Sequence, residues 1–94
     1  MPKRNEAPPW MIAAVKETLL RKWDPIEIQD EPLAHDEYDS YIRVICRLLI
    51  EERGAAILAN HLLELETVSM GLNGNYNHCL LVAYELLKLS SRRT

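Results

Sequence analysis

Apolar side chains recur every three or four residues along most of this chain, a spacing that places them on one face of an α-helix. No segment shows the strict alternation of apolar and polar positions that is typical of a β-strand. The first helix is expected to begin at Pro9, because proline is tolerated in the first turn, and to end near Trp23. Its expected inward-facing residues are Ile12, Val15, Leu19 and Trp23.

The same spacing predicts three more helices. The second should begin near Asp36, whose carboxylate can cap it, and Gly54 should end it. The third is expected over residues 55–70, and the fourth from Tyr76 to Leu89 or Ser90, after a turn that leaves Asn75 as its cap. The expected inward-facing residues are Tyr38, Ile42, Ile45 and Leu49 in the second helix, Ile57, Leu58, His61, Leu62, Leu65 and Val68 in the third, and Cys79, Val82, Ala83, Leu86 and Leu89 in the fourth.

Helical periodicity stops between residues 24 and 36. Pro25 and Pro32 in this stretch each prevent a continuous helix or a central strand, although Asp24 and Pro25 could start one short turn. The predicted fold class is therefore all-α, a small bundle of about four helices with a long proline-containing loop between helices one and two.

Length and composition predict a single helical domain over residues 1–94. A chain of 94 residues with 48% apolar residues can bury one core but is short for two domains. Residues 1–7 are expected to form a flexible leader and residues 91–94 a flexible tail. Because a core of this size gives only modest stability, the chain is expected to be a monomer or a homodimer.

The net charge of −3 gives no general attraction to nucleic acid, so nucleic acid is not an expected partner. No membrane association is expected either, because no secretory signal is recognisable and the apolar stretches fall far short of the roughly 20 residues that cross a bilayer. Cys46 and Cys79 are too few for a disulfide framework and are expected to stay reduced. Together these features predict a cytoplasmic protein.

Acidic residues are concentrated between helices one and two. Seven of the 14 acids lie within residues 24–39, which contain no Lys or Arg. Such a segment is typical of a solvated loop, and it could also dock a basic protein or weakly bind a hard cation. The candidate binding surface comprises Trp23, Asp24, Pro25, Asp36, Glu37, Tyr38, Asp39 and Tyr41. Core packing is the favoured interpretation of its three aromatic residues, and surface recognition is the alternative.

Catalytic patterns are lacking, so an enzyme, a cofactor and a metal site are not expected. The glutamate pairs at residues 51–52 and 64/66 do not form the E-x-x-E ladder that would hold magnesium, and three glycines allow no phosphate-binding loop. His35 and Asp39 could face one metal ion but lack further ligands. His61 is expected to be a hydrogen-bonded residue at the core edge, and His78 points away from Cys79.

Two resemblances concern the same region. The segments Trp23-Asp24-Pro25-Ile26-Glu27-Ile28 and Asp36-Glu37-Tyr38-Asp39-Ser40-Tyr41 resemble a family of small uncharacterised bacterial helical proteins that carry a W-D-P-I-G element followed by D-E-Y-D. The resemblance implies a compact helical domain of unknown function with a regulatory or interaction role. Glu27 departs from the pattern, since the family usually has glycine there.

The second resemblance is to acyl carrier proteins, acidic helical bundles with an Asp-Ser-Leu motif at the start of their second helix. Asp39-Ser40-Tyr41 is similar, which implies phosphopantetheine on Ser40. However, Tyr41 replaces the leucine and the third helix is too long. The leading hypothesis is a non-enzymatic module for protein–protein interaction or regulation that uses the acidic loop with its flanking aromatics. An acyl-carrier-like protein and a weak metal-binding domain are the alternatives.

Overall fold

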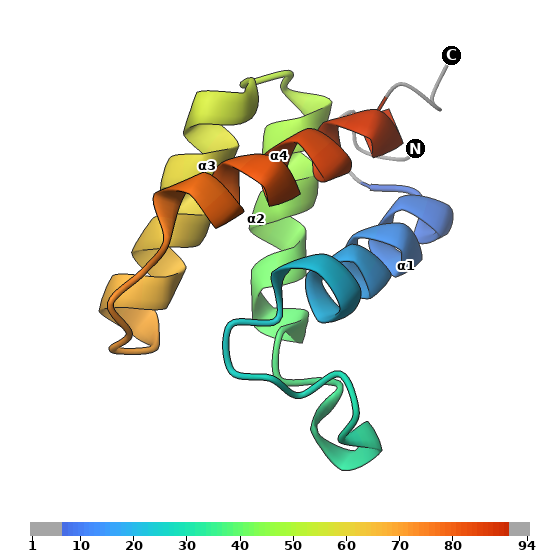
Figure 1. The fold of residues 1–94 in the computed structure, drawn as a ribbon. Helices are drawn as coiled ribbons and strands as arrows, with labels where there is room; N and C mark the ends of the chain where they lie inside the picture. The colour runs from blue at the N-terminus through green and yellow to red at the C-terminus, as the bar shows by residue number, and fades with distance from the viewer. Residues whose placement is uncertain (1–6, 91–94) are drawn as a thin grey trace.

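A computed structural model describes residues 7–90, and this part of the chain folds into four α-helices without a β-strand. The all-α prediction is therefore confirmed. Figure 1 shows α4 crossing in front of α2 and α3, while the long loop between α1 and α2 projects below them. The α-helices are α1 (Pro9–Thr18), α2 (Asp39–Ile50), α3 (Ala55–Glu64) and α4 (Tyr76–Ser90). The other helical segments are the π-helical η1 (Leu19–Trp23) and η3 (Leu65–Ser69) and the 3₁₀ turn η2 (Pro32–Ala34).

Two predicted helices end in a π turn, which sequence periodicity did not indicate. The first helix runs from Pro9 to Trp23 as predicted, but its last five residues form η1. The third helix likewise continues from α3 into η3. A π turn contains one more residue than an α turn and therefore rotates the residues that follow it. Val68 is 75% exposed, against expectation, whereas Glu66 is only 3% exposed and extends the core face of Ala59 and Leu62.

Two other expected core positions were wrong. Ile12 and Ile57 are both exposed, because the residue beside each of them occupies the inward direction. Met11 is fully buried and lies four residues before Val15, so these two side chains stack on the core face of α1. In α3, Leu58 is fully buried and occupies the inward direction beside Ile57. The inward-facing residues predicted for the second and fourth helices are all buried.

The start of the second helix differs from the prediction, because α2 begins at Asp39 and Asp36 does not cap it. Tight turns take up the residues before it. The Ala34 N–H donates to the Glu31 carbonyl at 2.8 Å, and the Glu37 N–H donates to the Ala34 carbonyl at 3.0 Å. Pro32 starts the first of these turns with its fixed φ. The acidic loop, by which we mean residues 24–38, is therefore longer than the sequence suggested.

All four helices contribute to one hydrophobic core. Ala7, the last residue of the predicted leader, is partly buried and packs against this core. Residues 1–6 and 91–94, the remainder of the predicted leader and the predicted tail, lie outside the described residues. None of the helices within residues 7–90 is both long and apolar enough to cross a bilayer.

His61 is partly buried on α3, and its Nε2 atom is buried without a hydrogen-bond partner among the described residues, against the expected bonded state. Burial lowers the pKa of His61 from its ordinary value of 6.5, and the nearby Glu64 carboxylate only partly opposes this effect. The imidazole is therefore held neutral in the folded chain.

Replacing His61 with Gln tests this assignment through the pH dependence of the free energy of unfolding. Above pH 6.5 the histidine is neutral in both states, so it adds no pH dependence. As the pH falls below 6.5, the unfolded chain takes up a proton more readily than the folded chain, and the wild type should lose stability faster than His61→Gln. Urea unfolding at pH 7.5, 6.5 and 5.5 measures the difference; parallel pH profiles would contradict the assignment.

Candidate functional site

Asp24 organises the start of the acidic loop. It follows η1 directly, and its backbone has left-handed angles, with φ at +33°. Its Oδ1 accepts hydrogen bonds from the Ile28 N–H at 2.7 Å and from the Tyr38 hydroxyl at 2.9 Å. Its Oδ2 accepts a third from the Gln29 N–H at 3.2 Å. Because a carboxylate with three donors ties both ends of the loop together, Asp24 acts as an internal clamp.

Trp23 connects this loop to the opposite side of the bundle. Its ring is 2% exposed and packs against Tyr38, at 5.2 Å between ring centroids, and against Tyr41, at 6.2 Å. The indole Nε1–H donates to Oε2 of Glu66 at 2.7 Å. The Trp23 carbonyl lies 3.2 Å from Nε2 of His78, on α4. The side chain and the backbone of Trp23 therefore both bond to the α3–α4 region.

Glu66 carries the buried carboxylate of this network, and sequence reasoning did not identify it. Its oxygens accept from the Trp23 indole, from the Cys79 thiol at 3.2 Å and from the Asn75 N–H at 3.0 Å. A charge in the core is costly unless hydrogen bonds replace its hydration, and these donors supply that replacement. The signal available in the sequence is its spacing, since Glu66 lies four residues after Leu62 and seven after Ala59, both of which are buried.

The buried groups around this network keep their protons at neutral pH. Burial, reinforced by the Glu66 carboxylate, raises the pKa of the Cys79 thiol to about 12. Burial also raises the pKa of Cys46 to about 11 and that of Tyr38 above its ordinary value of 10. Neither thiol is an activated nucleophile, since activation requires a lowered pKa. The network is therefore suited to holding the structure together.

The candidate binding surface divides into a buried and an exposed part. Trp23 and Tyr38 lie in the core and do not form a surface, which corrects their place in the binding set and agrees with the core-packing interpretation. The Asp24 carboxylate is occupied by internal donors, and Pro25 and Tyr41 are only partly exposed. Asp36, Glu37 and Asp39 are exposed, as are three further acids of the loop, Glu27, Asp30 and Glu31.

Five of these exposed acids form no ion pair within residues 7–90. Asp39 differs from them, because its carboxylate lies 3.1 Å from Nζ of Lys16.

Glu27 has φ at +54°, the left-handed region that glycine favours, so the chain takes a glycine-like angle where the resembled family usually has glycine. Ser40 is exposed in the first turn of α2. No three His, Cys, Asp or Glu side chains in the described part could together hold a metal ion.

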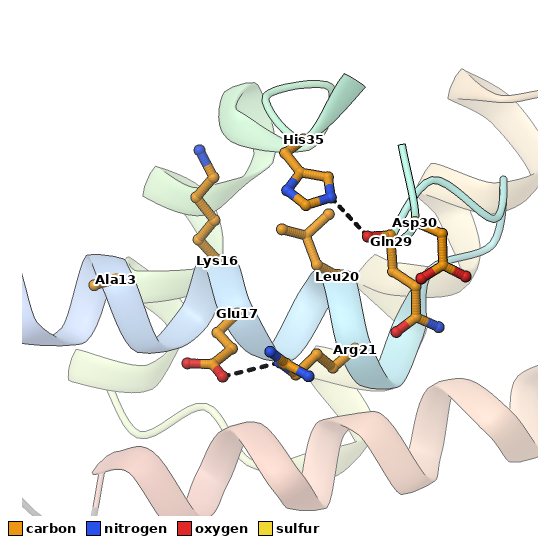
Figure 2. A pocket seen from close by; sticks show the side chains of 8 residues that line it. All are labelled: Ala13, Lys16, Glu17, Leu20, Arg21, Gln29, Asp30 and His35. Atoms are coloured by element: carbon orange, nitrogen blue, oxygen red, sulfur yellow. Dashed lines mark hydrogen bonds and ion pairs between the residues drawn. The ribbon is translucent and has the colours of Figure 1, made fainter. Parts of the chain in front are cut away.

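A groove of about 440 Å³ separates the acidic loop from α1 and η1. Figure 2 shows the His35 ring above it, where Nε2 donates to the Gln29 carbonyl at 2.7 Å. Both cations on its wall are already paired, Lys16 with Asp39 and Arg21 with Glu17 at 2.9 Å. Its lining includes Asp30, an exposed carboxylate that forms no ion pair among the described residues. The groove therefore offers no free lysine or arginine to an anionic ligand, and its unpaired charge adds to that of the acidic loop.

Comparison of the chain with protein-family models, curated proteins and solved structures finds no match. The resemblance to the W-D-P-I-G family therefore stays a prediction.

Replacing Trp23 with Phe tests the buried network, because it removes the indole donor while keeping an aromatic ring. We expect the free energy of unfolding to fall by about 2–3 kcal/mol, since a buried carboxylate loses a donor and the smaller ring packs less well. Trp10→Phe is the matched control: Trp10 is 41% exposed, and the change should cost less than about 0.5 kcal/mol. Equal losses in denaturant unfolding would contradict the network.

Proposed function

We propose that this chain is a non-enzymatic protein–protein interaction module that presents its acidic loop to a basic partner protein. The observation that carries the proposal is the set of five exposed carboxylates on one projecting loop, without an ion pair among the described residues: Glu27, Asp30, Glu31, Asp36 and Glu37. The nearest lysine and arginine along the chain are Lys22 and Arg43, which lie outside the loop. A concentration of one sign of charge speeds the encounter with oppositely charged proteins and disfavours acidic ones.

The internal support of the loop strengthens the proposal. Binding is weakened when a flexible segment must be ordered, so a loop that is already held costs less entropy on association. Here the Asp24 carboxylate receives two backbone N–H groups and the Tyr38 hydroxyl. Between these points, the His35 ring closes the loop onto the Gln29 carbonyl. The buried aromatics thus contribute by supporting the charged surface from beneath.

Four exposed acids of the loop can be neutralised without touching the clamp. The loop variant carries Asp30→Asn, Glu31→Gln, Asp36→Asn and Glu37→Gln. A control variant neutralises four exposed acids elsewhere: Glu17→Gln, Glu51→Gln, Glu52→Gln and Glu64→Gln. Each variant removes four negative charges, which takes the formal net charge from −3 to +1. The two variants therefore have the same formal net charge, and the control also releases Arg21 and Arg53 from their ion pairs with Glu17 and Glu51.

Quantitative co-purification from extract of the producing cells, at low and high salt, tests the proposal. We expect the loop variant to recover about tenfold less of the proteins that co-purify with the wild-type chain, and the control variant to retain them. High salt should release them, because salt screens the attraction between exposed charges on the two proteins. Equal recovery with both variants would contradict the proposal.

A further inference from the structure

The acidic loop and the connection between α3 and α4 are joined through one residue. Every hydrogen bond between residues 19–38 and residues 66–79 in the described chain involves Trp23, either its indole on Glu66 or its carbonyl near His78. Glu66 in turn accepts the Asn75 N–H, and the Asn75 side chain accepts the His78 N–H at 3.1 Å in the first turn of α4. Trp23 therefore contacts both the start of η3 and the first turn of α4.

On the loop side, Trp23 is covalently followed by the clamp residue. Asp24 has φ at +33°, a conformation that costs free energy for a residue other than glycine and persists only when its surroundings impose it. Besides the hydrogen bond from the Asp24 N–H to the Leu19 carbonyl at 2.8 Å, two further constraints impose it here. The three donors hold the Asp24 carboxylate in place, and the buried Trp23 ring fixes the preceding peptide. Releasing the indole from Glu66 would remove the second constraint.

We propose that Trp23 is a latch that couples the acidic loop to the α3–α4 connection, so that local opening at either end promotes opening at the other. The coupling is a property of the free chain and does not require that the loop bind a partner. It is also reciprocal, because a coupling free energy acts equally in both directions. One consequence is that anything that rigidifies the acidic loop also rigidifies the first turn of α4. In the described chain no residue of the acidic loop itself hydrogen-bonds to α4, and the Trp23 carbonyl makes that contact.

Native-state amide hydrogen exchange measured by NMR tests the latch from one end. Glu66→Gln weakens the indole bond, and the amides to watch are those of Ile28 and Gln29, which donate to Asp24. We expect their exchange to accelerate about tenfold, which corresponds to a coupling of about 1.4 kcal/mol. Glu64→Gln, on the exposed face of α3, is the matched control and should leave these amides unchanged.

The reverse experiment uses Asp24→Asn, which weakens the clamp while keeping a residue that tolerates left-handed angles. The amides of Asn75 and His78, which donate to Glu66 and to the Asn75 side chain, should then exchange faster. Asp36→Asn, an exposed change in the same loop, is the control. Amides in the middle of α2 report global unfolding in every variant. The latch requires that the exchange of the watched amides accelerate more than the exchange of these α2 amides.

The result that overturns the latch is a change confined to the mutated end. If Ile28 and Gln29 exchange no faster in Glu66→Gln than the α2 amides account for, the two regions open independently. Should Glu66→Gln prove too unstable to study, Trp23→Phe removes the same bond and retains the ring, and the same comparison of amides decides the question.

Discussion

The structure depends on satisfying one carboxylate in the core. Glu66 is 3% exposed and has no cation beside it in the described part of the chain, so its charge must be stabilised by hydrogen bonds alone. Its donors come from η1, from the turn before α4 and from α4 itself. This requirement fixes the orientation of the Trp23 ring and the point at which α4 begins. Through Trp23 it also fixes the position of Asp24, the first residue of the acidic loop.

The acidic segment therefore combines two kinds of residue with different roles. Trp23, Asp24 and Tyr38 face inward, and their hydrogen bonds hold the loop to the bundle. The remaining acids face solvent, and they give the surface its charge. The buried residues set the shape of the loop, and the exposed residues give it the charge on which the proposed interaction rests.

The sequence predicted the helices well, because each buries one continuous face and the 3.6-residue period records that face. The fourth helix begins at Tyr76, and its inward-facing residues are all buried, as the pattern indicated. The π turns were not predictable from this period, because they depart from it. Val68 was placed inside and Glu66 was overlooked, because the buried face of the third helix is centred on Leu58, Ala59 and Leu62 and not on its longest apolar stripe. Asp36 was assigned as a cap because local rules favour it, whereas tight turns delay α2 until Asp39.

The hydrogen bond from the Trp23 indole to the buried Glu66 carboxylate is the contact on which these features depend. The most direct test is the exchange of the two indole Nε1–H protons with heavy water, followed by NMR in the wild-type chain. We expect the Trp23 proton to exchange orders of magnitude more slowly than that of Trp10, whose ring is 41% exposed. Exchange of both indole protons at the same unprotected rate would contradict it.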